Sequence, residues 1–325
     1  MKKRTLIQAA AVAVTALAWA GPTLAQDFPP AKPVTLVVGF APGGAADAAA
    51  RLIAKKLAEN IGQAVVVENK GGAGGNIAHQ QVAAGVADGT VLLFGSVGPL
   101  TIAPHLMKLP YDPFKDLAPI SGGVYFPNVL VVHKGAGVKT LAEFVQLSKA
   151  KPGSVDFAST GAGSASHLAG ELFNQRAGID MVHVPYKGGA PALQDLLGER
   201  VTSYFAAPPT AMPHVETGKL IPLATTGLTR PAYLPNIPTV AESGYPGFQA
   251  LNWYAFVAAA KTPAPLLERW NQEIVKALGD PGVKEALNKH GLSPHPTTRA
   301  EFASFMKKEY EQWGAIVRER KITAQ

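Results

Sequence analysis

From residue 34 onward, short apolar runs alternate with helix-like segments. Residues 34–38 read as a buried strand, and a helix pattern follows a glycine-containing turn at residues 47–57. Further strands are predicted at residues 64–68 and 90–95, separated by a glycine-rich loop and a second helix pattern. This alternation predicts a mostly parallel sheet with helices on both faces, because parallel strands need crossover connections. Ligands of such sheets bind beyond the carboxyl ends of the strands.

The middle of the chain repeats the theme. Strands are predicted at residues 129–132, 155–158 and 181–186, and residues 204–206 form the end of another. Thr140 and Glu143 have capping-box spacing at the start of one intervening helix. A proline-rich connector then leads to amphipathic helices, which are predicted at residues 265–278, 281–290 and 298–319. At 325 residues, two lobes are favoured over one.

The first 25 residues have the layout of a secretory signal peptide. Lys2, Lys3 and Arg4 precede an apolar stretch, and small residues follow near Ala25. We expect cleavage before Gln26, a cut after Ala20 being the weaker alternative. This predicts a periplasmic protein. The competing reading, a membrane anchor, conflicts with the shortness of the apolar stretch.

Cysteine usage and charge exclude several classes of site. No cysteine is present, which excludes a disulfide framework, a lipid-modified cysteine and a thiol-bound metal. The formal net charge is +7, or +4 without the three N-terminal cations, and no basic block stands out. We therefore expect no nucleic-acid partner.

The turn at residues 39–47 carries the clearest chemical signal. Its glycines allow close backbone approach to a ligand, and the first amides of the next helix are unpaired at the positive end of its dipole. Such a turn binds an anion without any charged side chain. Asp47 would cap the helix or fix the loop, although an ordinary strand–helix turn has the same pattern. The candidate ligand-binding residues here are Phe40, Ala41, Gly43, Gly44, Ala45 and Asp47.

A second glycine-rich turn repeats this device in the other half of the chain. Thr160, Gly161 and Ser164 combine backbone amides with hydroxyl donors. His167 lies on the following helix, where packing or bracing of the loop is favoured over ligand contact. Other candidates for the cleft are Ser96, Thr101, Tyr186 and Ala206, which lie at or after the ends of predicted strands. Residues 252–254, after the proline-rich connector, could also line the cleft, although core packing is favoured for Trp253 and Tyr254.

Sequence motifs of enzymes are lacking. Phe94 occupies the first glycine position of a nucleophile elbow around Ser96, and no dinucleotide or P-loop motif is present. The eight histidines are scattered without metal-ligand spacing. We therefore predict a non-enzyme that needs no metal or cofactor.

The motifs together resemble the Bug (TctC-like) receptors of tripartite tricarboxylate transporters. The similarity runs in order along the mature chain, through residues 40–47, 68–77, 87–90, 159–168, 184–188, 218–220, 238–242, 253–254 and 261–263.

The resemblance implies a type II, Venus-flytrap periplasmic-binding-protein fold whose chain crosses twice between lobes. Residues 26–127 and 248–325 would form lobe 1, and residues 128–247 lobe 2. It also implies capture of a small carboxylate by the 40–47 and 160–164 loops, partly through water, and delivery to a membrane permease. We expect a monomer.

Two departures from the family pattern bear on the ligand. Ala45 replaces a frequent serine or threonine, and Ala206-Ala207 stands where an Asp or Asn is common. Without an acidic partner for an ammonium group, a mono- or dicarboxylate, including an aromatic one, is favoured over an amino acid.

Two other functions stay open at this point. A sensory receptor would bind the same ligand and differ only in its membrane partner. A hydrolase would depend on Ser96, Ser164 or Ser166.

Overall fold

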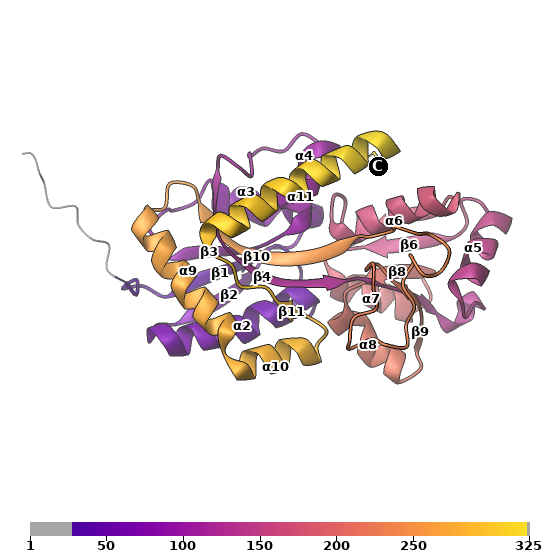
Figure 1. Ribbon diagram of the computed structural model, residues 1–325, viewed down its shortest axis with the longest axis horizontal. Helices are drawn as coiled ribbons and strands as arrows, with labels where there is room; N and C mark the ends of the chain where they lie inside the picture. Colours follow the sequence, from indigo (N-terminus) through magenta and orange to yellow (C-terminus); the bar gives the residue numbers. More distant parts are fainter. Residues whose placement is uncertain (1–27, 324–325) are drawn as a thin grey trace, which may run out of the picture.

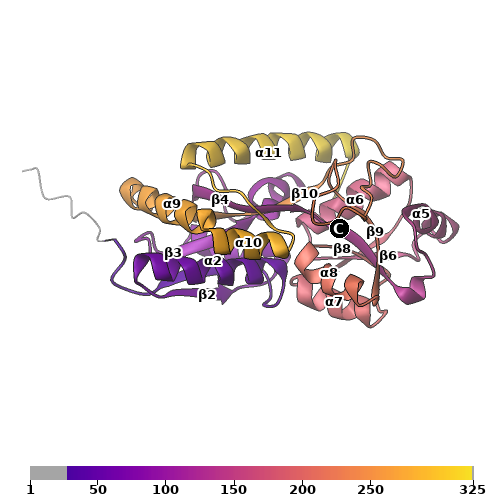
Figure 2. The ribbon, with the colours of Figure 1, turned by 60° about the horizontal axis from the view of Figure 1, so that its bottom comes forward.

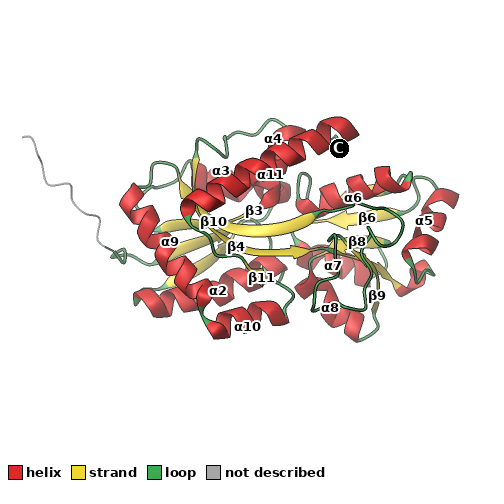
Figure 3. Ribbon diagram, in the orientation of Figure 1, coloured by secondary structure: helices red, strands yellow, loops and turns green. Residues whose placement is uncertain are grey.

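Two β-sheets, each flanked by helices, organise the chain (Figure 1). The computed structural model describes residues 28–323, so the predicted signal peptide lies outside the described residues. The two sheets lie side by side along the long axis of the molecule, with helices packed around each (Figure 3). This confirms the predicted two-lobed α/β fold.

The sheet of lobe 1 has six strands in the order β11-β4-β10-β3-β1-β2. These are β1 (Val34–Val38), β2 (Val65–Asn69), β3 (Val91–Ser96), β4 (Leu117–Pro127), β10 (Leu251–Ala259) and β11 (Ser293–Pro294). Strands β2, β1 and β3 are parallel, as predicted, whereas β10 runs antiparallel to β3 and to β4.

Helices cover both faces of this sheet (Figure 2). One face packs on α2 (Ala45–Ile61), α9 (Ala264–Gly279) and α10 (Pro281–Lys289). The other packs on α3 (Asn76–Ala83), the π-helical turn η2 (Gly98–Ile102), α4 (Ala103–Leu106) and α11 (Arg299–Arg320), while a short turn, η1 (Ala73–Gly75), precedes α3. Trp270 anchors the first face, because its buried indole packs there and donates a hydrogen bond to the Gly89 carbonyl at 3.0 Å.

The sheet of lobe 2 has five strands in the order β7-β6-β8-β5-β9. They are β5 (Val129–His133), β6 (Asp156–Ser159), β7 (Val182–Pro185), β8 (Ser203–Ala206) and β9 (Leu220–Thr225). The helices are η3 (Lys134–Ala136), α5 (Leu141–Ala150), α6 (Ala165–Ala177), α7 (Gly189–Leu197) and α8 (Pro208–Glu216). Helix α5 begins at the predicted capping box, in which Thr140 and Glu143 satisfy each other's backbone amides.

Both sheets are mixed because of how the chain crosses between lobes. Asn128 alone joins β4 of lobe 1 to β5 of lobe 2, and residues 226–250 lead back from β9 to β10. Strand β10 therefore starts at the lobe boundary and runs away from it, whereas its neighbour β4 runs toward it. Antiparallel pairing within an otherwise parallel sheet follows directly from this connection.

Among residues 28–323, no helix is long and apolar enough to span a membrane.

Candidate ligand-binding site

A narrow cavity of about 10 Å³, enough for a single water-sized group, lies between the two lobes. Lobe 1, lobe 2 and the crossing residue Asn128 all contribute to its wall. The lining residues are Phe40, Gly44, Ala45, Ala46, Asn128, Thr160, Ser166, Gly189, Tyr204, Phe205, Ala207, Thr210, Asn252 and Tyr254. None of these side chains carries a charge at neutral pH, so the site offers only neutral hydrogen-bonding groups and aromatic surface.

Four helices begin at the cavity wall. The lining includes the cap of α2 (Gly44), the second residue of α6 (Ser166), the first residue of α7 (Gly189) and the cap of α8 (Ala207). The first amides of a helix have no intrahelical acceptor, and in α2 and α7 no side-chain cap accepts from them either. Helix α8 begins with two prolines, which lack amide hydrogens, and contributes its dipole and the Thr210 hydroxyl. Positive helix ends therefore converge from both lobes on one uncharged cavity.

Asp47 fixes the first loop from behind. Its Oδ2 accepts hydrogen bonds from the Gly43 amide and from Arg51 Nε, both at 3.0 Å. Burial alone would raise the pKa of Asp47, but the Arg51 guanidinium and the Gly43 amide hold that pKa below its ordinary value. The carboxylate is thus already neutralised by Arg51, and it braces the loop as the sequence interpretation expects.

The same guanidinium ties the loop to the neighbouring strand. Arg51 Nη2 donates to Asn69 Oδ1 at 3.1 Å, and Asn69 Nδ2 donates to the Phe40 carbonyl at 3.0 Å. The end of β2 therefore supports the loop that follows β1.

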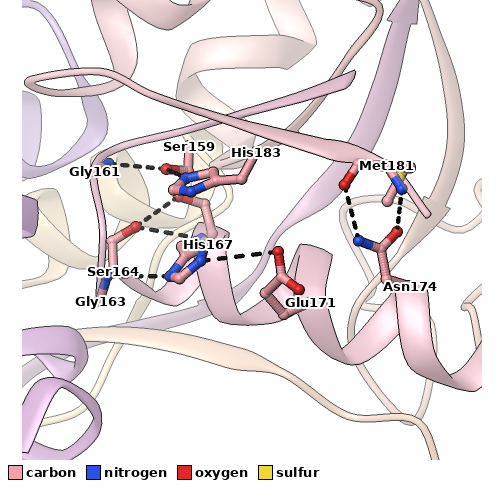
Figure 4. A network of polar contacts seen from close by, with 10 residues as sticks. Ser159, Gly161, Gly163, Ser164, His167, Glu171, Asn174, Met181 and His183 are labelled. Atoms are coloured by element: carbon pink, nitrogen blue, oxygen red, sulfur yellow. Dashed lines mark hydrogen bonds and ion pairs between the residues drawn. The ribbon is translucent and has the colours of Figure 1, made fainter. Parts of the chain in front are cut away.

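A network of serines and histidines holds the second loop (Figure 4). The Gly161 amide donates to Ser159 Oγ, which is also hydrogen-bonded to His183 Nε2 at 2.6 Å. At the other end of the loop, the Gly163 amide donates to His167 Nδ1 at 3.1 Å. Burial, followed by the neighbouring His183, lowers the pKa of His167 to about 3, and burial lowers that of His183 to about 4. Both rings are therefore neutral at neutral pH.

Hydroxyl groups complete this loop. Ser166 Oγ accepts a hydrogen bond from the Thr160 amide at 2.9 Å and lies 3.2 Å from Thr160 Oγ1. Ser164 caps α6 by accepting from the His167 amide at 3.3 Å. Thr160 and Ser166 line the cavity, whereas Ser164 does not.

The lobes touch along a seam of glycines beside the cavity. The Ala41 amide of lobe 1 donates to the Lys187 carbonyl of lobe 2 at 3.0 Å. Gly74 meets Ala162 and Gly161 so closely that a β-carbon on Gly74 would lie 2.3 Å from the Ala162 carbonyl oxygen. A β-carbon on Gly98 would lie 2.6 Å from the Gly163 carbonyl oxygen. Glycine at these positions lets the two backbones approach, and so lets the helix ends meet around the cavity.

The fourteen residues predicted for ligand binding fall into three groups. Phe40, Gly44, Ala45 and Thr160 line the cavity. Six others shape or brace the two loops without lining it: Ala41, Gly43, Asp47, Gly161, Ser164 and His167. The remaining four point elsewhere or are enclosed: Ser96, Thr101, Tyr186 and Ala206.

Two members of the last group, Thr101 and Tyr186, are hydrogen-bonded within their own lobe, whereas Ser96 Oγ is buried without a hydrogen-bond partner. The buried Thr101 hydroxyl donates to the Val97 carbonyl within its own turn, at 2.8 Å. Tyr186 donates to Asp195 at 2.9 Å, on helix α7. Ala206 is fully buried in β8, one residue before the lining residue Ala207.

The main contributors that sequence reasoning missed are Asn128, Tyr204 and Thr210. Asn128 interrupts an apolar run between two strands, and an isolated polar residue in such a run was the available signal. Tyr204 and Thr210 had no signal of their own, because only the path of the chain brings them to the cavity. Core packing is favoured for Tyr254 by the sequence, and the structure places it both in the core and in the cavity wall.

The chain matches the family model for the tripartite tricarboxylate transporter family receptor over residues 49–322. It belongs to this receptor family. The relative BugT of Bordetella pertussis strain Tohama I is 38% identical over 302 residues, which cover 92% of each chain. The predicted resemblance to Bug receptors is therefore confirmed.

Solved structures of similar proteins support the same assignment. The periplasmic binding protein BugD is 32% identical, with a TM-score of 0.86, over 91% of this chain and 100% of that one. Rpa4515 of R. palustris with adipate is 33% identical, with a TM-score of 0.87, over 91% and 99%. MatC of Rhodopseudomonas palustris with bound malate is 32% identical, with a TM-score of 0.85, over 89% and 99%. These family receptors thus include structures with carboxylates.

Proposed function

We propose that this protein is a periplasmic receptor that captures a small carboxylate between its lobes and passes it to a tripartite tricarboxylate-type permease. The observation that carries the proposal is the convergence of four helix N-termini from both lobes on an uncharged cavity. A helix end stabilises an anion by about 0.3–1 kcal/mol, so four ends supply several kcal/mol together with direct amide and hydroxyl donors.

The crossing pattern supports a capture mechanism. We take the described residues up to 127, with those from 248 onward, as one moving lobe, and residues 128–247 as the other. The loop at residues 40–47 and the loop at residues 160–164 would each hold part of the carboxylate, and closure would complete the site. The family's adipate- and malate-bound relatives favour this ligand class. Export would follow from the N-terminal signal sequence.

Binding without turnover is the expected outcome. Ser96 Oγ is buried without a hydrogen-bond partner, and Ser164 and Ser166 are hydrogen-bonded to each other. Within residues 28–323, none of these three hydroxyls is hydrogen-bonded to a histidine ring, so none of the three has the adjacent base that a serine nucleophile needs.

Calorimetric titration of the mature protein with small carboxylates and with their neutral amides tests the proposal. An acid should bind at least about 30-fold more tightly than its amide, which corresponds to about 2 kcal/mol from the helix ends. Gly44→Val should abolish this binding, because its β-carbon would already be in van der Waals contact with the Gly189 amide, 3.5 Å away, which leaves no room for the two γ-methyl groups beside the narrow cavity. Gly279→Ala is the control, since a β-carbon at that site meets nothing within 4 Å. Equal affinity for acids and amides would refute carboxylate capture.

A further inference from the structure

Asn128 has an unused hydrogen-bond donor at the point where the lobes join. Its backbone amide donates to Thr226 Oγ1 at 2.9 Å, and its carbonyl accepts from the Thr226 amide at 2.9 Å. Thr226 in turn exchanges hydrogen bonds with Ala250, at 2.7 and 2.9 Å. The first crossing and both ends of the returning segment are thereby tied together, so the position of Asn128 is fixed from both lobes.

The side chain of Asn128 is hydrogen-bonded at one end only, through a long contact. The residue is 1% exposed and lines the cavity. Its Oδ1 accepts from Asn252 Nδ2 at 3.4 Å, whereas its buried Nδ2 has no hydrogen-bond partner. Buried donors are almost always satisfied, so an orphaned one beside a binding cavity indicates a group that the ligand completes.

The surroundings of this amide select the chemistry of that group. Tyr204 and Tyr254 also line the cavity, and burial raises the pKa of each phenol, so both stay protonated. The cavity wall therefore offers neutral amide and hydroxyl donors and no acidic side chain, which suits an oxygen acceptor and does not suit an ammonium group.

We propose that Asn128 is a specificity-determining residue. Its Nδ2 donates to an oxygen at one end of the bound ligand, and the helix ends hold the carboxylate group at the other end. This inference rests on the proposed function and narrows its ligand class. The ligand is a short acid with a hydroxyl or a second carboxylate at its other end. A plain alkyl acid would leave Asn128 Nδ2 unsatisfied.

Two matched ligand series test the proposal by calorimetric titration. The first consists of butanoate, 4-hydroxybutanoate and succinate, and the second of hexanoate, 6-hydroxyhexanoate and adipate. At the chain length that fits, the acids with a distal oxygen should bind wild-type protein at least about tenfold more tightly than the alkyl acid. Preference for the hydroxy acid or for the diacid distinguishes a hydroxyl from a second carboxylate, and either supports the proposal.

The variant Asn128→Leu separates recognition from structure. It should lose the preference for a distal oxygen while alkyl-acid affinity stays within about threefold. An equal loss for all three acids would identify a merely structural role and overturn the proposal, as would a wild type that prefers the alkyl acid or shows no preference. If Asn128→Leu does not fold, Asn252→Leu replaces it. That variant removes the hydrogen bond that orients Asn128 and should reduce the same preference.

The two proposals fail in different ways. If wild-type protein binds no carboxylate better than its amide, the proposed function is wrong. If it binds carboxylates but ignores the distal oxygen, the function stands and the role of Asn128 is wrong.

Discussion

The imidazole rings of His167 and His183 stack with their centroids 4.0 Å apart and 24° between their planes. Each ring holds one end of the second ligand loop, His183 through Ser159 and His167 through the Gly163 amide (Figure 4). Two neutral imidazoles can stack in this way, whereas a proton on either one would place a charge inside the lobe.

This stacked pair predicts acid sensitivity. Burial holds both pKa values below the ordinary value of 6.5, to about 3 and about 4. Between about pH 6.5 and pH 4 the unfolded chain therefore binds protons that the folded chain does not, and stability is complete above this window and falls as pH falls through it. Denaturant titrations across this range measure how the free energy of unfolding changes with pH. In His183→Gln this pH slope should be smaller by about 1.4 kcal/mol per pH unit, the contribution of about one proton.

The glycine seam predicts that lobe closure is sensitive to a single methyl group. Gly74→Ala should weaken carboxylate affinity more than tenfold, because its β-carbon would clash with the Ala162 carbonyl. With ligand present, small-angle scattering should give this variant a larger radius of gyration than wild type. Gly137→Ala is a matched control. Gly137 has a similar positive φ of 71°, against 64° for Gly74, but a β-carbon there meets nothing within 4 Å. Both variants should lose about 1–2 kcal/mol of stability from the strained backbone. Equal affinity in the two variants would show that the seam does not control closure.

Asp47 predicts a difference between two substitutions at one site. Asp47→Asn keeps an oxygen that can accept from the Gly43 amide, so carboxylate affinity should stay within about threefold of wild type. Asp47→Ala removes that acceptor and should weaken affinity about tenfold or more, as the loop loses its brace. Calorimetric titration of both variants provides the check. If the two variants bind alike, the loop does not depend on this hydrogen bond.

Thr140 caps helix α5, which contributes no residue to the cavity wall, so its substitution should affect stability alone. Thr140→Ala removes the acceptor of the Glu143 amide and should lower the free energy of unfolding by about 1 kcal/mol. Ligand affinity should not change. Thr140→Ser, which keeps the hydroxyl, should restore most of the lost stability, and a change in affinity in either variant would contradict this assignment.

Local sequence patterns determined much of the fold. Strands β1, β2, β3, β5 and β6 and helices α9, α10 and α11 lie within about two residues of their predicted bounds, and α5 begins at its predicted cap. Apolar periodicity, glycine turns and capping residues act over a few neighbouring positions, which is why these bounds can be predicted locally. Strands β4, β9 and β10 were not predicted. Strand β4 contains two prolines and two glycines, which normally mark turns, and its pairing with β10 joins segments about 130 residues apart.

The sequence by itself determined the glycine-rich loops, the helix starts behind them and the family of the protein. Only the tertiary structure decided which side chains share the cavity. Asn128, Tyr204 and Tyr254 lie on three separate strands or crossings, and they meet because the chain crosses twice between lobes and the glycine seam lets the lobes touch. The unsatisfied Asn128 amide depends on the same long-range arrangement, since the presence or absence of a hydrogen-bond partner is a property of the packed neighbourhood and not of the local sequence.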